Sequence, residues 1–282
     1  MTLVDPRPVV TAARAGGYGV GAVNVTLIEH AEAIVNGAER AGAPVVLQLS
    51  ENAVRYHGAL APIAAATLRI AQSACVPVAV HLDHAESTGL VRQAVELGFT
   101  SVMYDGSVLP LEENLATTRE MVRLCHAAGI AVEAELGAIG GKGGAHAPGV
   151  RTDPGEAAEF VAATGVDWLA VAVGSAHAMA TRGAKPDLEL IGRIAAAVPV
   201  PLVLHGSSGV ADPNLTDAVR AGMTKVNVAT HLNKVFTARV REVLAGSDAI
   251  VDARKYIGPA REAMALEVER LLGVLLAAGT AR

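Results

Sequence analysis

The sequence predicts an α/β protein that forms a single (β/α)8 (TIM) barrel with an additional C-terminal helix. Its 282 residues suit one such barrel, which takes about 250 residues. Hydrophobic residues make up 51% of the chain and aromatic residues only 3%, so the core must consist of small aliphatic side chains. Short β-branched runs also alternate with amphipathic helical patterns along the whole chain, and we therefore expect one barrel domain over residues 1–282.

Eight short apolar runs predict the strands. They are continuously apolar, as expected for parallel strands that are covered on both sides. The runs lie at 20–25, 45–50, 76–82, 101–105, 131–136, 167–173, 200–205 and 225–229.

Helical patterns separate these runs. Those at 28–42 and 111–129 both end at Gly, and the prolines of 196–201 end another before the next strand. Beyond residue 230 we expect helices at 231–245 and 259–278, the second packing on the barrel or on a neighbouring subunit. No linker or low-complexity stretch interrupts the series, which favours a closed barrel over the alternative, a doubly wound open sheet.

Charge, cysteine content and hydropathy narrow the class of protein. A formal net charge of -5 provides no basic footprint for nucleic acid. Cys75 and Cys125 cannot form a disulfide framework and indicate a reducing compartment. The N-terminus has no signal-peptide pattern, and no apolar stretch approaches the roughly 20 residues of a membrane span. We expect a soluble, cytoplasmic protein with no membrane partner.

Polar or ionisable residues stand where nearly every apolar run ends. In a (β/α)8 barrel the carboxyl ends of the strands converge on one face, which carries the chemistry. Residues spread over the chain are therefore expected to meet in one pocket. They are Asn24, Ser50, Asp83 with His84, Asp105, Glu135, His177, His205, and Asn227 with Thr230.

Three histidines of this set indicate a metal site. His84, His177 and His205 stand at the ends of three different predicted strands. Neutral imidazoles suit zinc, and three protein ligands with an open position is the catalytic arrangement. The alternative for each is an ordinary histidine at the start of a loop. By contrast, we expect His30, His57, His126 and His231 to be surface residues, and His81 to support the site without binding metal.

Asp83 directly precedes His84. Neighbouring side chains leave a strand on opposite faces, but a bend at the strand end allows both to line the mouth. A carboxyl group next to a metal suits proton transfer. Its alternative role is to orient a histidine.

Two short stretches predict a phosphate-binding cradle. HGSSG at 205–209 has small residues that let an anion approach the backbone N–H groups, and NVAT at 227–230 leads into a helix N-terminus. Barrels often bind phosphate at the loops after strands seven and eight. The segment 137–149, with six glycines in thirteen residues, predicts a mobile lid, or otherwise a surface loop without function.

The motifs HLDH, VEAELG, AVGSAH, LVLHGSSGV and KVNVAT, in this order and spacing, resemble those of the class II fructose-bisphosphate and tagatose-bisphosphate aldolases. The resemblance runs from about Val20 to the segment ARKYIGPAREAM. It implies a metal-dependent carbon–carbon lyase that cleaves a ketose phosphate to dihydroxyacetone phosphate and an aldehyde, without a Schiff-base lysine. It also implies a homo-oligomer, a dimer or a tetramer.

The resemblance implies a role for each matched residue. His84, His177 and His205 would hold catalytic Zn²⁺, with Asp105 and Glu135 at an inner or second metal position. Asp83 would be the acid/base for the hydroxyl formed at the new bond. Substrate and phosphate would contact Asn24, Ser50, Gly206, Ser208, Asn227 and Thr230, together with Arg254, an arginine that often reaches the distal phosphate from a neighbouring subunit.

The sequence departs from the family pattern at the lid. No Asp or Glu lies between Leu136 and Arg151, so His146 is the titratable candidate for the base that removes the carbon-bound proton. The alternative is a lid that only covers the site. Ala178 replaces a glycine and affects the backbone approach to phosphate or to a monovalent cation, and NVAT is closer to the tagatose-type branch. The competing functions are a zinc hydrolase on the same fold and an inactive sugar-phosphate binder.

Overall fold

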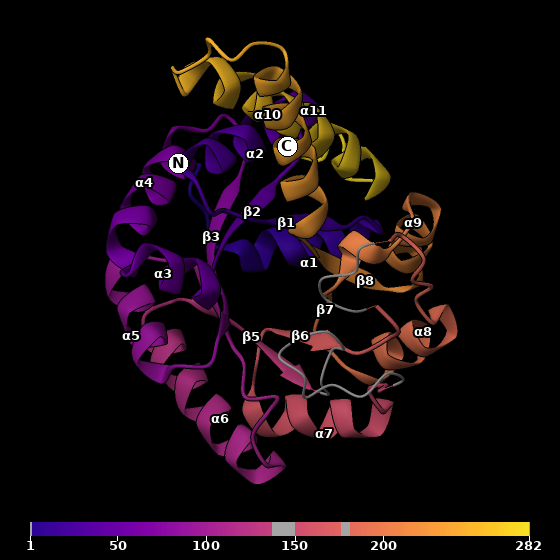
Figure 1. Cartoon of the computed structure of the whole chain (residues 1–282). Coiled ribbons are helices and arrows are strands. Elements are labelled where there is room, and N and C mark those ends of the chain that lie inside the picture. Colours follow the sequence, from indigo (N-terminus) through magenta and orange to yellow (C-terminus); the bar gives the residue numbers. More distant parts are fainter. Residues whose placement is uncertain (1, 137–149, 176–180, 282) are drawn as a thin grey trace.

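The computed structural model describes residues 2–136, 150–175 and 181–281, and its centre is a closed barrel of eight parallel strands (Figure 1). The strands follow one another in chain order, and β1 pairs with both β2 and β8, which closes the sheet. The predicted barrel is confirmed and the open sheet is excluded. The strands are β1 Val20–Asn24, β2 Val45–Ser50, β3 Val78–Ala85, β4 Ser101–Tyr104, β5 Ala131–Leu136, β6 Trp168–Val171, β7 Leu202–Leu204 and β8 Met223–Val228.

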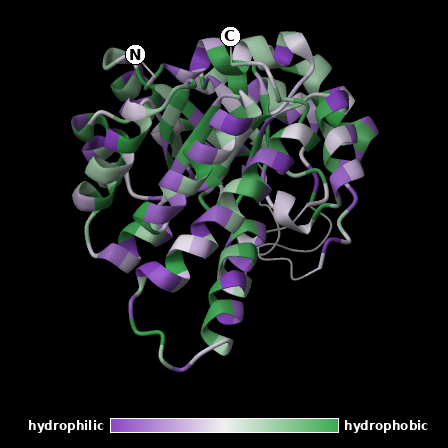
Figure 2. Cartoon of the chain, turned by 90° about the horizontal axis from the view of Figure 1, so that it is seen from above, coloured by the Kyte–Doolittle hydropathy of each residue, from purple (hydrophilic) through white to green (hydrophobic). Residues whose placement is uncertain are grey.

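Helices surround the barrel, and the outer ones carry hydrophobic and hydrophilic stripes (Figure 2). Side-chain caps begin several of them, as at Ser87 and Asp153. None of the described helices is long and apolar enough to cross a membrane. They are α1 Pro6–Gly16, α2 Ile28–Ala41, α3 Glu51–His57, α4 Leu60–Ser73, α5 Thr88–Leu97, α6 Leu111–Ala127, α7 Pro154–Thr164, α8 Leu188–Ala197, α9 Asp212–Ala221, α10 Thr230–Ala245 and α11 Arg254–Val274, with a 3-10 turn, η1, at Ser207–Gly209.

Helix α1 closes the amino-terminal end of the barrel, and the sequence analysis did not predict it. Its Val10 and Ala13 form a buried cluster with inward-facing strand residues such as Trp168. The signals that could have found it are the Asp5 cap and Pro6 in the first helical turn. A second apolar layer lies between the strands and the outer helices. These two layers leave the carboxyl ends of the strands as the place for a polar site.

The third strand is longer than predicted. It continues past residue 82 to Ala85, and its pairing with β4 shifts between Leu82 and Ala85. His84 has φ 50, in the left-handed region that a non-glycine residue rarely adopts. This irregularity has the form of a β-bulge, which redirects side chains locally. The bend expected at the strand end is therefore a bulge within the strand.

The C-terminal helix begins at Arg254 and not at 259, so the predicted start was wrong. Pro259 lies inside the helix and lacks the N–H that would bond to the carbonyl of Lys255. The helix continues because this lost bond falls near its exposed beginning.

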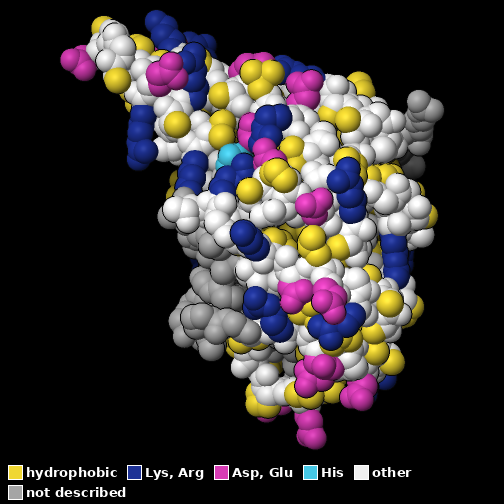
Figure 3. All heavy atoms as spheres, turned by 90° about the vertical axis from the view of Figure 1, so that its right-hand side faces the viewer, with side chains coloured by type: hydrophobic (Ala, Val, Ile, Leu, Met, Phe, Trp, Pro, Cys, Tyr) yellow, Lys and Arg dark blue, Asp and Glu magenta, His cyan; other side chains and the backbone are white. Residues whose placement is uncertain are grey.

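Helices α10 and α11 form an arm that projects from the body of the molecule (Figures 1 and 3). In α10 the buried residues are Leu232 and Phe236, and in α11 they start at Ala260. None of the described residues between Phe236 and Ala260 is fully buried, although Val240 and Ile257 pack against the core.

Candidate active site

The bulge in β3 brings His84 next to two buried carboxylates from the following two strands, β4 and β5. Its Nδ1 lies 2.8 Å from Oδ2 of Asp105, directly after β4, and 3.8 Å from Oε2 of Glu135 in β5. Because a carboxylate only accepts hydrogen bonds, a neutral His84 that donates from Nδ1 carries its lone pair on Nε2. The structure thus brings these three predicted residues within one group.

His205, directly after β7, is fully buried beside His84. The two rings meet edge to face with centroids 4.6 Å apart. Nε2 of His205 lies 2.9 Å from Oε1 of Glu133, and Nδ1 lies 3.5 Å from Oε2 of Glu135. Donation from Nε2 to Glu133 leaves the lone pair of a neutral His205 on Nδ1, the ring nitrogen on the side of Glu135.

These side chains form two groups that fit a divalent metal. One comprises Asp83, His84 and His205, and the other comprises His84, Asp105 and Glu135; within each group the ligand atoms lie within 4.8 Å of one another. Imidazole and carboxylate donors suit zinc and similar first-row ions. The carboxylates bonded to both histidines supply the orienting contacts that such ligands usually have. The predicted ligand His177 lies outside the described residues.

Asp83 is buried and is held between two amide side chains. Its Oδ2 accepts from Nδ2 of Asn24 at 3.1 Å, and its Oδ1 accepts from Nδ2 of Asn227 at 3.3 Å. Burial by itself would raise the pKa of Asp83, but the basic groups of His84, His205 and Lys225 outweigh it and hold that pKa below its ordinary value. The strands at both ends of the sheet order, β1 and β8, thus fix the carboxylate next to the metal group.

A charged layer lies directly beneath these residues, and the sequence analysis missed it. Lys225 is fully buried, with Nζ 2.8 Å from Oε2 of Glu133 and 2.8 Å from Oδ1 of Asn227. Nδ1 of His81 forms a hydrogen bond with Oγ of Ser101 at 2.9 Å. Burial lowers the pKa of His81 to about 3, and the positive charge of Lys225 acts in the same direction. His81 thus lies close to the candidate site, 3.9 Å from Glu133.

The signal for this layer was present in the sequence. Glu133 and Lys225 each stand two residues before a predicted site residue, Glu135 and Asn227, in the same strand. Residues two apart in a strand face the same side, so both had to point into the barrel. A charge at such a position requires a partner, and each is the partner of the other.

The loops after β7 and β8 form the other side of the site. Gly206 has φ 69 and begins the η1 turn, a conformation that favours glycine. The hydroxyl of Ser207 donates to the carbonyl of Asn227, and Oγ of Ser208 accepts the N–H of His231 over 3.1 Å. Thr230 is the first residue of α10. The residues predicted for phosphate binding therefore lie next to a helix N-terminus, which favours an anion.

Three predicted substrate residues have other contacts. Asn24 accepts from Gln48 at 3.2 Å in addition to binding Asp83. Oγ of Ser50 caps α3 by accepting the N–H of Ala53 at 3.2 Å. Arg254 is 90% exposed and pairs with Asp252 at 2.7 Å, so the fold of this chain does not bring it to the other candidates. His146 and Ala178 lie outside the described residues.

Of the four histidines expected at the surface, two are exposed and two are not. His57 and His126 are exposed, but His30 is buried, which was wrong. His30 faces inward from α2 and packs edge to face on Phe236 of α10 at 4.8 Å. His231 is partly buried and is bonded to Glu267.

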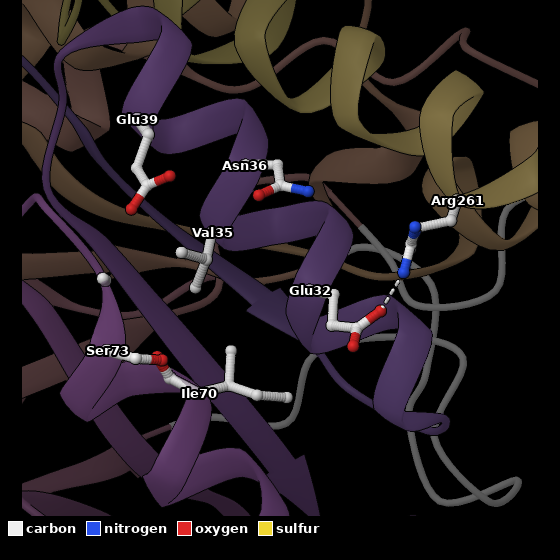
Figure 4. Close-up of a pocket in the computed structure, with 8 residues that line it drawn as sticks. Glu32, Val35, Asn36, Glu39, Ile70, Ser73 and Arg261 are labelled. Carbon is white, nitrogen blue, oxygen red and sulfur yellow. Dashed lines mark hydrogen bonds and ion pairs between the residues drawn. The ribbon is translucent and has the colours of Figure 1, made fainter. Parts of the chain in front are cut away.

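A groove on the outside of the barrel lies between α2 and α4 and is bordered by Arg261 of α11 (Figure 4). Its lining combines acidic groups with a few small side chains, and Arg261 reaches Glu32. It contains none of the predicted site residues.

A family model described as "Fructose-bisphosphate aldolase class-II" matches residues 4–280. The chain is similar to the fructose-bisphosphate aldolase of Thermus caldophilus, with 40% identity over 289 residues, covering 93% of this chain and 94% of that protein. It is 39% identical over 269 residues to the fructose-bisphosphate aldolase of Staphylococcus aureus strain Mu50, covering 94% of each.

Solved structures agree with the fold. The YdjI aldolase of Escherichia coli K12 has a TM-score of 0.88 and 32% identity, covering 99% of this chain and 100% of that one. A putative fructose-1,6-biphosphate aldolase of Coccidioides immitis has a TM-score of 0.87 and 32% identity, covering 98% of each.

Proposed function

The chain belongs to the class-II fructose-bisphosphate aldolase family and is an aldolase, a carbon–carbon lyase; we propose that the two sides of the barrel mouth carry its chemistry and its phosphate binding. The reaction makes or breaks the bond between dihydroxyacetone phosphate and an aldehyde. The observation that carries the residue assignment is the bulge in β3, which puts Asp83 and His84 on one face with His205. We further propose that residues 1–282 act as one barrel unit in the cytoplasm.

We propose zinc as the catalytic metal, with His84, His205 and His177 as its ligands. The donor chemistry and the carboxylates bonded to both described histidines support this assignment. Asp105 and Glu135 would serve an inner or second metal position. When bound, the ion supplies positive charge next to the ketone oxygen of the substrate.

Asp83 is the acid/base in this proposal. In the cleavage direction its carboxylate accepts the proton of the hydroxyl next to the bond that breaks, and in synthesis it returns a proton to that oxygen. Asn24 and Asn227 hold the two carboxylate oxygens, so the group keeps one orientation through the reaction. Lys225 and Glu133 position His205 and Asn227 from below.

The phosphate of dihydroxyacetone phosphate is assigned to Gly206, Ser208, Asn227 and Thr230. The helix dipole at the start of α10 and the small residues of η1 support this placement. Ser50 would contact substrate at the end of β2. From the family resemblance, we also propose that a monovalent cation binds near this phosphate.

Arg254 would bind the distal phosphate from a neighbouring subunit of a homo-oligomer, a dimer or a tetramer. Its exposure at the first residue of α11, one of the two helices of the arm, supports this arrangement. Mixing two variants tests it. Subunits with Arg254→Ala keep Asp83, and subunits with Asp83→Ala keep Arg254, so a mixed oligomer can form a complete site between neighbours. Recovery of activity on mixing is expected if the arm serves a neighbour, and no recovery would show that each chain uses its own arginine.

His146 is the proposed base for the carbon-bound proton. Solvent deuterium exchange into dihydroxyacetone phosphate is the test: His146→Ala should slow exchange more than it weakens binding. An unchanged exchange rate would leave the segment as a cover over the site.

The aldolase assignment is tested with metal-loaded protein, dihydroxyacetone phosphate and a panel of aldehydes. Formation of a ketose phosphate with at least one aldehyde is expected, and its identity names the substrate. Phosphate binding without turnover would indicate an inactive binder, and hydrolysis without aldol chemistry would indicate a zinc hydrolase. Neither alternative has support among the relatives, which are named aldolases.

A further inference from the structure

One residue joins the phosphate side of the mouth to the C-terminal helix. His231 is the second residue of α10, and its N–H donates to Oγ of Ser208 at 3.1 Å. Its imidazole Nε2 lies 2.5 Å from Oε1 of Glu267 in α11. The backbone of His231 therefore contacts the proposed cradle while its side chain contacts a helix on the outside of the barrel.

Glu267 is itself held in place. Nε and Nη2 of Arg270 donate to its two oxygens at 2.9 and 2.7 Å. Burial would raise the pKa of Glu267, but the hydrogen bonds from Arg270 and His231 lower it to about 2. The carboxylate is therefore an anion at neutral pH, and charged acceptors make the stronger hydrogen bonds.

The contacts continue to two more loops at the same end of the barrel. Nη1 of Arg270 donates to Oδ2 of Asp212, the first residue of α9, at 2.5 Å. Asp212 also pairs with Arg182, whose Nε donates to the carbonyl of Val210 at 2.9 Å. The loops after β6, β7 and β8 are thus all tied to α11 through one set of side chains, which we call the brace. It consists of Arg182, Asp212, His231, Glu267 and Arg270.

We propose that His231 is a positioning residue, which holds the start of α10 against α11 through the brace and thereby sets the affinity of the cradle for phosphate. This inference rests on the proposed phosphate site. Ala229, the residue before α10, makes no side-chain capping bond, so the first turn depends on contacts from other elements, namely Ser208 and Glu267. Anion binding by backbone N–H groups depends on their direction, and an error of about 1 Å is enough to reduce binding and rate.

The test measures KM for dihydroxyacetone phosphate, kcat, and inhibition by inorganic phosphate in metal-loaded protein. His231→Leu removes the bond to Glu267 and keeps an apolar side chain of similar size. KM and the inhibition constant of phosphate should both rise by about tenfold, the effect of losing one hydrogen bond to a charged group. The kcat should change by less than about threefold, because Asp83 and the metal ligands lie on other strands.

Two further variants make the outcome specific. His231→Gln, whose amide nitrogen can replace Nε2, should recover most of the phosphate affinity. Glu262→Gln is the matched control, because it breaks a pair of the same helix, with Arg40 of α2 at 2.7 Å, that does not reach the cradle. It should leave both constants unchanged.

Several results would overturn the inference: unchanged constants in His231→Leu, an equal loss in Glu262→Gln, or no recovery in His231→Gln. If His231→Leu does not fold, Glu267→Gln gives the same test, with KM expected to rise and kcat to persist. If the wild-type protein catalyses the aldol reaction and His231→Leu leaves KM and the inhibition constant of phosphate unchanged, only the positioning role is removed. A wild-type protein that neither binds phosphate nor catalyses the aldol reaction removes the proposed function with it.

Discussion

The two sides of the barrel mouth are built in different ways. On the proposed metal side the candidate groups are side chains of strands or of the residues that directly follow them, and their contacts lie inside the barrel, as between His205 and Glu133. On the proposed phosphate side the candidate groups are backbone amides and hydroxyls of short loops, such as Ser208. Their supporting contacts lie outside the barrel, on α11.

This difference follows from the two tasks. Metal ligands and a proton-transfer group need fixed atoms at fixed distances, which packed strands provide. A phosphate needs several N–H donors that converge on one point, which only a turn or a helix N-terminus provides. Loops are less rigid than strands, so the phosphate side needs support from a further element. Changes on the metal side should therefore affect turnover, and changes on the phosphate side should affect binding.

Removal of the metal should have the largest effect. Chelator-treated protein is expected to lose all aldol activity and to regain it with zinc or a similar divalent ion, because the described donors fit such an ion. The measurement is aldol cleavage with and without added metal. Full activity in excess chelator, together with borohydride trapping of substrate on a lysine, would contradict the metal assignment.

Asp83→Ala should lower kcat by roughly 10²–10⁴-fold, the usual range for a general acid/base. The protein should retain its metal, which is measured by elemental analysis of the same sample. Loss of the metal along with the activity would instead assign Asp83 to orienting the ligands. Turnover at the wild-type level would remove it from the mechanism.

Lys225→Met should destabilise the fold by about 3–5 kcal/mol, because it leaves Glu133 as a buried charge without its cation. Denaturant unfolding of the metal-free protein measures the loss. The control is Lys255→Met at an exposed position of α11, which should change stability by less than about 0.5 kcal/mol. Equal stability of the two variants would show that the charged layer is not needed for folding.

Ser208→Ala tests the phosphate side with a smaller change. It removes the acceptor of the His231 N–H and a hydroxyl from the cradle. KM for dihydroxyacetone phosphate should rise by about three- to tenfold with little change in kcat. A fall in kcat at constant KM would mean that the two sides of the mouth are not divided as proposed.

Glu267→Gln should lower the free energy of unfolding by less than Lys225→Met does, and the loss should depend on pH. The pKa of Glu267 is lowered to about 2 in the folded protein, against about 4.3 in an unfolded chain. Its charge therefore stabilises the fold above about pH 4.3, and this contribution is lost as the pH falls toward 2. A difference of about 1–2 kcal/mol from wild type at pH 7, shrinking with acid, is expected in denaturant unfolding. A difference that is constant with pH would contradict the ionised state of Glu267.

The sequence by itself determined the barrel and the residues at its mouth. Apolar runs such as 45–50 and 131–136 have a local pattern that predicts strands directly, and the structure reproduces these bounds. Once eight parallel strands are expected, topology brings their carboxyl ends together. For that reason His84 and His205 could be predicted as neighbours although they stand 121 positions apart in the sequence, 205 minus 84.

Only the tertiary structure decided which side chains pair and how each is turned. Lys225 meets Glu133 across 92 residues, and this contact depends on the register with which the barrel closes. The left-handed backbone of His84 arises from a shift in pairing with β4, and the bond from His231 to Glu267 depends on where α11 packs. Local sequence patterns fix the type of each element, because they reflect residues close in the chain. Registers and packing angles depend on the whole set of long-range contacts, which no single segment contains.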